Sequence, residues 1–545
     1  MSDKKSTNAP ISDLKLNRKP ESPDSEAPSV DSLREDLAER ARVLAAFVAE
    51  SAKDESMSFM SFEKALRAEV FALARVAAVL FLALAEERVV SQLSARFQRR
   101  GRWFRKAPRQ ERGLQTTFGV VRYWRTYARP VGDTRGRGFH PVDASLGLSA
   151  DRFSLPVLSL AVRLATKVSF AEAHSTLGWF VPTPPATEVI EQATLGMGRY
   201  TTEWFETAPA PEGDGDVLVV LVDSKAVPTA TAAELKRRRG KRKRRSTAGS
   251  ARHRGRRKRK KNGKKPRRAK GDKSKNGKAA TLVVMYTLKR QGKYLLGPIN
   301  RWVYASFAPK KHAFVIARRE AAKRGFGPES GKTVQLVTDG DEDLQRYGAE
   351  YLPQAIHTLD IMHVIEKLWT AGQCLYPEGS DELKSWVERQ KDKLYAGRVS
   401  DVLRTLRRRL TQIPATGPGT KGKRKRLTDI IAYIDKRVAM MNYDELRAAD
   451  LEIASGAVEG AVKYIIGRRC DHGGMRWIKQ RAEAVLQLRC IDANGDWERF
   501  IERMHDKNRD RAMQHGERIR IQQKDPGELP EIPAEPPQAT MLEAA

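Results

Sequence analysis

The sequence predicts a multidomain α+β protein in which helical and β-rich N-terminal regions precede an α/β core. At 545 residues the chain is too long for one hydrophobic core and indicates several domains. Apolar residues recur at helical spacing between Leu37 and Leu93, whereas residues 116–127 are rich in the β-branched and aromatic side chains of a hairpin. From Gly215 onward, apolar runs of strand length alternate with helical patterns, which is typical of an α/β domain.

The net charge indicates the kind of partner. The chain has a formal net charge of +34 and a pI near 10.1. Nucleic acid is the leading candidate partner, because Lys and Arg bound to phosphates displace condensed counterions, and a membrane surface comes second. Residues 236–278 contain 25 Lys or Arg and one acid, Asp272, so this segment alone supplies +24. Because this segment has no apolar periodicity, we expect a disordered loop. Such a loop would bind the backbone of a polyanion without recognising its sequence.

The composition predicts a soluble protein of a reducing compartment. The only long apolar run, Val70–Ala85, contains Arg75 and is shorter than the roughly 20 residues that span a bilayer, so we expect a buried or dimer-forming helix. The N-terminus lacks the apolar stretch of a signal peptide. The three scattered cysteines, Cys374, Cys470 and Cys490, fit neither a disulfide framework nor a paired zinc motif. We therefore expect a cytoplasmic chain with no membrane span.

Changes in composition along the chain predict its domains. A short helix starting at Ser169 and a longer one after Pro185 fit either a helix-turn-helix that reads DNA or an ordinary helical connector. In the N-terminal part of the chain we expect a disordered arm (1–35), a helical region (36–100), a small β-rich module (101–150) and helices with a possible helix-turn-helix (151–210). A core follows (211–370 and 450–500), which is interrupted by the basic loop (236–278) and by a helical insertion (371–449). The chain is expected to continue with a helix followed by a disordered tail (501–545). The helical and β-rich N-terminal modules are expected to bind DNA.

The core has a specific expected order of elements. Strands are expected at 217–223, 281–287, 294–307, 334–338 and 355–360, and helices at 311–323 and 342–351. The order β-β-β-α-β-α-β followed by helices is the plan of a ribonuclease H-like core, in which the first and fourth strands are neighbours. The acids that end these strands, Asp223 and Asp339, are then expected to meet. A third acid, Glu459, follows a turn of small residues that leads into a helical pattern.

Three carboxylates in this arrangement indicate a divalent-metal site. Mg²⁺ prefers oxygen ligands and keeps several waters, so it needs no His or Cys cage. Two such ions about 4 Å apart can activate an attacking oxygen and stabilise a leaving oxygen in phosphodiester cleavage. We expect Asp223 to bridge both ions, Asp339 to bind one and Glu459 the other. Taken singly, an Asp after a strand is more often a turn former, so the joint placement of the three acids carries the prediction.

Six motifs carry a resemblance to a known family: 222–228 (VDSKAVP), 337–341 (VTDGD), 359–369 (LDIMHVIEKLW), 455–460 (SGAVEG), 474–477 (GMRW) and 494–497 (NGDW). In this order they resemble the DDE transposases of bacterial insertion sequences, most closely the ISKra-type group, which is related to the Mutator-like transposases. The resemblance spans about 110–500. It implies hydrolytic nicking of double-stranded DNA at transposon ends and strand transfer into target DNA, with two Mg²⁺ (or Mn²⁺) ions. It also implies a homodimer or larger assembly in a bacterial cytoplasm, associated with the nucleoid.

The second acid of the family has two possible positions, Asp339 and Asp360. We choose Asp339 because it ends the fourth strand. Asp360 and His363 then resemble the C/D-x-x-H motif after the fifth strand of Mutator-like transposases, where His363 is either a phosphate contact or a structural residue. The chain departs from the family at Ser224, where a Gly is common, and at 129–141, which lacks a Cys-rich zinc motif. No zinc is therefore predicted.

Candidate DNA-binding residues flank the acids in the sequence: Lys225, Arg237, Arg238, Arg239, Lys241, Arg242, Lys243, Arg256 and Arg257 after the first, and Arg468, Arg469, Arg476 and Trp477 beyond the third. Basic groups beside an aromatic suit phosphate contact with base stacking, although a core Trp flanked by solvated arginines gives the same pattern. Two other functions fit the sequence. One is a non-catalytic nucleic-acid-binding protein, and the other is a ribonuclease H-like nuclease that cuts without joining.

Overall fold

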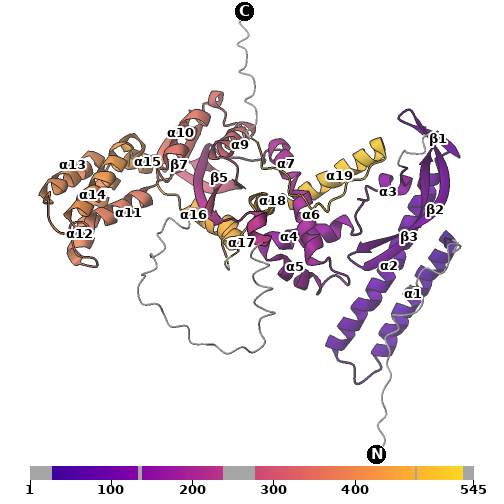
Figure 1. The fold of residues 1–545 in the computed structure, drawn as a ribbon. Helices are drawn as coiled ribbons and strands as arrows, with labels where there is room; N and C mark the ends of the chain where they lie inside the picture. Colours follow the sequence, from indigo (N-terminus) through magenta and orange to yellow (C-terminus); the bar gives the residue numbers. More distant parts are fainter. Residues whose placement is uncertain (1–26, 133–137, 237–276, 473–474, 532–545) are drawn as a thin grey trace, which may run out of the picture. The chain divides into compact units, whose positions relative to one another are not determined.

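The computed structural model describes residues 27–132, 138–236, 277–472 and 475–531, which divide into two compact units (Figure 1). The first unit contains residues up to Val157 together with 178–184 and His505–Ile519. The second contains Leu158–Leu177, Pro185–Met504 and the residues from Arg520 on. The expected helical region and β-rich module of 36–150 therefore belong to one unit. The described residues form a mixed α+β fold with two separate sheets.

The first unit packs a helical hairpin against an antiparallel sheet. The helices are α1 (Val30–Ser51) and α2 (Phe59–Ser91), and the strands are β1 (Arg96–Arg99), β2 (Arg102–Thr116) and β3 (Gly119–Pro130) in the order β1-β2-β3. A short α3 (Pro141–Ser145) follows. Apolar side chains of α2 form a core with the sheet and α3, made of Leu82, Ala85, Leu114, Val121, Tyr123 and Val142.

Helix α1 begins earlier than the sequence predicted. Ser29 caps it, because its side chain accepts a hydrogen bond from the Ser32 backbone N–H (3.1 Å), and Asp31 lies in the first turn. Leu33 is buried. Residues 30–35 of the expected disordered arm are therefore helical, because a capping residue and one apolar anchor are enough to start the helix here. The rest of that arm, residues 1–26, lies outside the described residues.

Helix α2 is longer and more exposed than expected. Among the described residues it is the one helix whose length and composition would allow it to cross a membrane, and 22% of its most apolar stretch is buried. It packs against α1, β3 and α3. Val70, Phe81 and Leu84 nevertheless remain exposed. Of the two expected alternatives, a fully buried helix does not hold, because α1 and the sheet cover only part of its circumference, and a dimer-forming helix stays a prediction.

The second unit contains a five-stranded sheet. Its strands are β4 (Val217–Pro228), β5 (Gly277–Gln291), β6 (Tyr294–Ser306), β7 (Thr333–Thr338) and β8 (Ala355–Leu359), in the order β6-β5-β4-β7-β8. Strands β4, β7 and β8 are parallel, whereas β5 and β6 are antiparallel to their neighbours. Residues Val217–Val222 are all buried, as expected for a central strand covered on both faces. The expected pairing of the first and fourth strands is confirmed.

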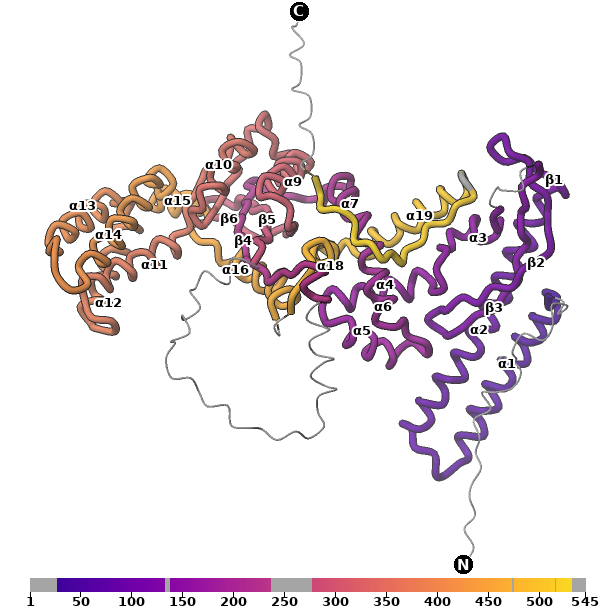
Figure 2. Tube along the Cα trace, in the orientation of Figure 1, coloured from indigo at the N-terminus to yellow at the C-terminus, as the bar shows by residue number. Residues whose placement is uncertain are grey.

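Helices from several parts of the chain cover this sheet. Helix α9 (Lys310–Lys323) packs against β5 and β6, α10 (Glu342–Tyr351) against β7 and β8, and α18 (Lys479–Ala493) against β6. Helix α11 (Ile361–Gly372) follows β8 directly. The helices expected in 371–449 are α12 (Asp381–Tyr395), α13 (Val399–Gln412), α14 (Thr420–Asp435) and α15 (Tyr443–Ala448). As Figures 1 and 2 show, α12, α13 and α14 lie side by side, and with α11 they form a core of their own.

The region 151–210 is helical, and its connections are more typical of an ordinary connector than of a helix-turn-helix. Its helices are α4 (Leu155–Lys167), α5 (Phe170–Leu177), α6 (Thr187–Gly198) and α7 (Thr201–Thr207). The connection 178–186 between α5 and α6 exceeds the roughly three- or four-residue turn of that motif. Helix α6 is largely buried against α18, where Gly198 lies so close to Ala484 that an added Cβ would collide. This packing favours the connector alternative, since the buried face of α6 is used within the fold.

The last helix in the described part of the chain is α19 (Trp497–His515). Residues of the expected disordered tail that are described, 516–531, make specific contacts: Ile521 is buried, and the Gln523 backbone N–H donates to the Gln192 carbonyl (3.0 Å). Apolar side chains within a Pro- and Glu-rich composition explain why part of this tail packs. Residues 532–545 lie outside the described part of the chain.

Candidate active site

The register of the parallel strands aligns three aspartates. Val222 of β4 pairs with Thr338 of β7, and Thr338 pairs with Leu359 of β8. The next residue on each chain is an aspartate: Asp223, Asp339 and Asp360. Because parallel strands present the same end at one edge of a sheet, these three side chains begin at the same level on neighbouring strands. The expected meeting of the first two acids follows directly from this register.

Glu459 belongs to a short helix that packs on the same strands. Helix α16 (Gly456–Ala461) contacts β4 and β5, and it continues into a π-helix, Val462–Gly467. The Glu459 side chain is 49% exposed and lies 3.8 Å from the Lys463 ammonium. The predicted turn of small residues is therefore mostly helical. Short π-helical segments are rare and recur at functional sites.

The electrostatics of Asp223 link the predicted acids. Asp223 is half-buried, and burial raises the pKa of its carboxyl group above the ordinary value. A hydrogen bond from the Ser224 backbone N–H to Oδ1 (2.6 Å) lowers this pKa, whereas the negative charges of Asp339 and Glu459 raise it and His363 lowers it. Asp339, Glu459 and His363 thus all lie within electrostatic range of Asp223.

Asp339 is held by residues of the helical insertion. The Tyr433 hydroxyl of α14 donates to the Asp339 carbonyl (2.9 Å), and Arg437 donates to the Gly340 carbonyl (2.8 Å). The Asp341 backbone N–H donates to Asp339 Oδ1 (2.9 Å). Burial, opposed by Arg437 and reinforced by Asp339, raises the pKa of Tyr433 to about 12, so the hydroxyl stays a donor at neutral pH. The insertion therefore supports the site, a role that the sequence did not reveal.

Gly340 is expected to be essential for this arrangement. Its φ is +86°, and an added Cβ would lie 2.4 Å from the Tyr433 hydroxyl and 2.9 Å from Leu359. Gly340→Ala should destabilise the protein by about 1–2 kcal/mol from the left-handed backbone and about 1–3 kcal/mol more from overpacking. Gly331→Ala is the matched control, because Gly331 has φ +66° with no atom within 4 Å of the added Cβ. Urea unfolding measures both, and equal losses would contradict the role assigned to the close packing.

Asp360 is a structural partner of the Glu459 helix. It is completely buried. Its Oδ1 caps α11 by accepting from the Met362 backbone N–H (2.8 Å), and its Oδ2 accepts a hydrogen bond from the Ser455 hydroxyl, immediately before α16. Because both oxygens are occupied and no part of the side chain reaches the surface, Asp360 fits an auxiliary role better than that of a second acid.

His363 lies one turn along α11 from Asp360. Its Nε2 is 3.9 Å from Asp360 Oδ2, and its Nδ1 is 3.6 Å from a Glu366 carboxylate oxygen. The side chain is 33% exposed. The imidazole is partly exposed and lowers the Asp223 pKa, so it lies at the edge of the cluster formed by Asp223, Asp339 and Glu459, which we call the acidic cluster. From there it can contact a bound phosphate or orient its neighbours.

The predicted DNA-binding residues have different surroundings. Arg468 and Arg476 are exposed, and Lys225 lies 3.5 Å from Asp471. By contrast, Arg469 is 2% exposed and Trp477 is 9% exposed.

The burial of these two side chains has a structural cause. The Arg469 guanidinium stacks on the Trp477 ring (4.7 Å) and donates to the Ala165 carbonyl (2.8 Å), and burial lowers its pKa to about 10. The backbone of Trp477 bonds to Pro228 and Ala230 at the end of β4. Arg469 and Trp477 are therefore core residues rather than DNA contacts. The candidates Arg237, Arg238, Arg239, Lys241, Arg242, Lys243, Arg256 and Arg257 lie outside the described residues.

The donor set suits a hard cation. Asp223, Asp339 and Glu459 offer only oxygen atoms, and among the described residues neither Asp223 nor Asp339 has an ion pair with Lys or Arg. Of the three acids, Glu459 alone has a described Lys or Arg partner, the exposed Lys463. Within the described residues, no three His, Cys, Asp or Glu side chains are close enough to form a ready-made metal cage. Asp339 and Glu459 thus lie within electrostatic range of Asp223, but the three side chains are not arranged as a complete set of metal ligands.

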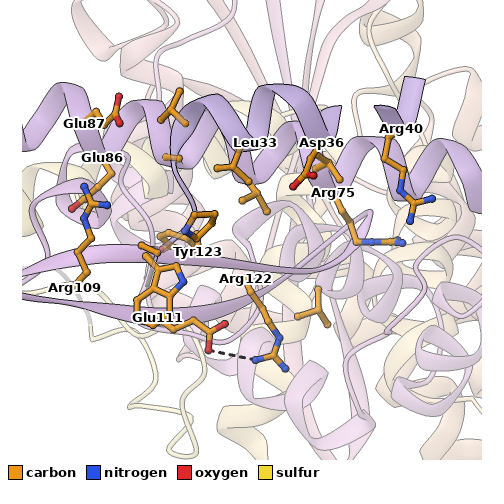
Figure 3. Close-up of a pocket in the computed structure, with 18 of the residues that line it drawn as sticks. Leu33, Asp36, Arg40, Arg75, Glu86, Glu87, Arg109, Glu111, Arg122 and Tyr123 are labelled. Carbon is orange, nitrogen blue, oxygen red and sulfur yellow. Dashed lines mark ion pairs between the residues drawn. The ribbon is translucent and has the colours of Figure 1, made fainter. Parts of the chain in front are cut away.

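A cavity also lies in the first unit. It has a volume of about 560 Å³ and is lined by α1, α2, β2 and β3 (Figure 3). Leu33, Val79 and Val120 contribute apolar surface, and Glu86 is buried with its Oε1 accepting from the Thr126 backbone N–H (2.6 Å). Its charged side chains include both signs, unlike the acidic cluster.

No protein-family model matches the chain, and no curated protein is similar enough to identify a relative.

Proposed function

We propose that this chain is a DNA transposase of the DDE type with a ribonuclease H-like core. One observation carries the proposal. Asp223 and Asp339 follow register-paired residues on two parallel strands, and the helix that carries Glu459 packs on the same sheet. Structural ion pairs would explain isolated acids, but the first two are not neutralised by any described Lys or Arg.

The strand order supports the core assignment. The order β6-β5-β4-β7-β8, with β5 and β6 antiparallel and β7 and β8 parallel to β4, is the one expected for a ribonuclease H-like plan. The helical insertion separates the fifth strand from the Glu459 helix, as the motif spacing implies. A fold of this kind hosts many activities, so the functional proposal rests on the acids.

Each acid has a distinct proposed role. Asp223 would hold both divalent ions (Mg²⁺ or Mn²⁺), Asp339 one of them and Glu459 the other. When bound, such ions supply activation of the attacking oxygen and stabilisation of the leaving oxygen. Tyr433 and the Asp341 backbone fix Asp339, while Asp360 fixes the start of the Glu459 helix through Ser455.

The substrate is double-stranded DNA, at transposon ends and at a target. Lys225, Arg468 and Arg476 are the described candidates for phosphate contacts near the acids. Holding two ends together requires a homodimer or larger assembly. The proposed location is the bacterial cytoplasm, in association with the nucleoid.

A strand-transfer assay tests this function. The full-length protein is mixed with labelled duplexes taken from the DNA that flanks its gene, a supercoiled target and Mg²⁺. We expect nicked ends and covalently joined products. Cleavage without joined products would favour a nuclease, and salt-sensitive binding without cleavage would favour a non-catalytic nucleic-acid-binding protein.

A further inference from the structure

Three exposed arginines form a row across the sheet of the first unit. Arg96 of β1 pairs in register with Arg105 of β2, and Arg105 pairs with Arg129 of β3. All three side chains are exposed. Neighbouring strands lie about 5 Å apart, so three positive charges stand beside one another on a single face. We refer to these three residues as the arginine ladder.

The fold gains nothing from this row. Like charges directly opposite each other on adjacent strands destabilise a sheet. Among the described residues, none of the three arginines has an acidic partner within ion-pair distance. A row of unneutralised cations therefore needs an explanation outside the folded unit.

The opposite face of the same hairpin behaves differently. Side chains alternate between faces along β3, so Arg122 lies on the face opposite the ladder, and it is one of the residues that line the cavity of Figure 3. There Arg122 lies 3.7 Å from Glu111 of β2. Arg75 of α2, which also lines the cavity, donates to the Phe118 carbonyl (2.9 Å). Arg122 and Arg75 thus have partners within the fold, whereas the ladder arginines have no acidic partner among the described residues.

A large aromatic side chain shares the face of the ladder. Trp103 lies two residues before Arg105 on β2, opposite Gln98, and is 52% exposed. The turn between β1 and β2 consists of Arg100 (φ +48°) and Gly101 (φ +73°), a two-residue turn that suits the twist of a hairpin. It holds the exposed Arg100 at the tip of this face.

We propose that the arginine ladder and Trp103 form a binding surface for the backbone of duplex DNA. The guanidinium fork suits phosphate oxygens, and a row of three can follow successive phosphates of one strand. The exposed indole adds an apolar contact beside them, which a merely solvated charged face would not need. The surface reads no bases, so it positions DNA rather than selecting a sequence. This inference relies on the proposed function only for the choice of duplex DNA as the polyanion.

Arginine-specific footprinting tests the surface directly. The full-length chain carrying Asp223→Asn, which prevents turnover, is treated with phenylglyoxal with and without a linear duplex, and each arginine is quantified by mass spectrometry. We expect the duplex to reduce modification of Arg96, Arg105 and Arg129 several-fold. Arg34 and Arg42 of α1, paired with Asp31 and Glu39, should keep their reactivity. Equal reactivity of the ladder with and without duplex, or protection by RNA or heparin but not by DNA, would overturn the inference.

A salt titration provides a second test. Each phosphate contact contributes about 0.9 to the slope of log affinity against log salt. The triple variant R96Q/R105Q/R129Q should therefore lower this slope by about 2 to 3, whereas the control R34Q/R42Q/R122Q removes the same charge and should lower it by less than about 1. Equal changes in the two variants would mean that only net charge matters, which contradicts a defined surface.

These outcomes are independent of the proposed catalysis. If the ladder were protected by duplex DNA while the wild-type chain cleaved no DNA, the transposase proposal would be refuted and the DNA-binding surface would stand. If the wild-type chain cleaved and joined DNA while the ladder were not protected, the DNA-binding surface would be refuted and the transposase proposal would stand.

Discussion

Asp223→Asn, Asp339→Asn and Glu459→Gln should each abolish DNA cleavage while leaving DNA binding nearly unchanged. Each substitution preserves size and removes one negative charge from the proposed ligand set. A catalytic metal supplies several kcal/mol of transition-state stabilisation. At about 1.4 kcal/mol per factor of ten, loss of a ligand should lower the cleavage rate roughly a thousandfold or more. The measurement is Mg²⁺-dependent nicking of labelled ends, with filter binding in parallel.

Glu342→Gln is the matched control for the three acids. Glu342 begins α10 close to Asp339 in the sequence, its side chain is 74% exposed, and its partners are Lys436 and Arg437. The control should retain near-normal cleavage. If any of the three acid variants cleaved as fast as this control, that acid would lose its assigned role.

Metal binding can be measured without activity. Because a ligand that binds only the folded state stabilises it, excess Mg²⁺ or Mn²⁺ should raise the melting temperature of the wild type. Asp223→Asn should abolish most of this shift, since Asp223 is the proposed bridging ligand, whereas Glu342→Gln should retain it. An identical shift in Asp223→Asn and the wild type would place the metal elsewhere.

Asp360→Ala should cost more stability than any of the three acid substitutions. It removes the cap of α11, worth about 1 kcal/mol, and leaves the buried Ser455 hydroxyl without its acceptor, worth about 1–3 kcal/mol more. A total loss of about 2–4 kcal/mol in urea unfolding follows from these two terms. Cleavage should also fall, because the N-terminus of the Glu459 helix loses its anchor.

Ser455→Ala separates the two consequences of losing Asp360. It breaks the same hydrogen bond but keeps the cap of α11, so it should lower cleavage with a smaller loss of stability. If Asp360→Ala proved as stable as the wild type and as inactive as Asp223→Asn, Asp360 rather than Asp339 would be the second acid.

The pairing of the first and fourth strands could be predicted from the sequence because the strands stand out as apolar runs and the expected order of elements makes these two neighbours. Asp223 and Asp339 could be paired for the same reason, since adjacent parallel strands fix the level of the residues that follow them. The role of Asp360 could not, because Ser455 is 95 residues away in the chain. The hydrogen bond from Tyr433 to the Asp339 carbonyl could not be predicted either, because a helical pattern does not indicate which distant backbone atom an aromatic side chain contacts.

The errors have a common physical origin. Helical spacing reveals that a segment has an apolar face but not how much of the helix other elements will cover. Helix α6 was therefore open to interpretation as a DNA reader, although α18 packs against it, and α2 was expected to be buried or dimer-forming, although few of its residues are buried. Arg469 and Trp477 show the same ambiguity, because a cation beside an aromatic ring looks alike on a surface and in a core.

The hydrogen bond between Asp360 and Ser455 joins the two ends of a long segment of chain that contains the helical insertion. The helical insertion has its own core, and its two ends meet where the Ile361 backbone N–H donates to the Ile453 carbonyl (3.0 Å). A preformed insertion removes most of the entropy that a flexible loop of that length would lose on closure. We therefore expect substitutions that loosen the core of the insertion, such as at Trp386, to release the Glu459 helix without changing any of the acids.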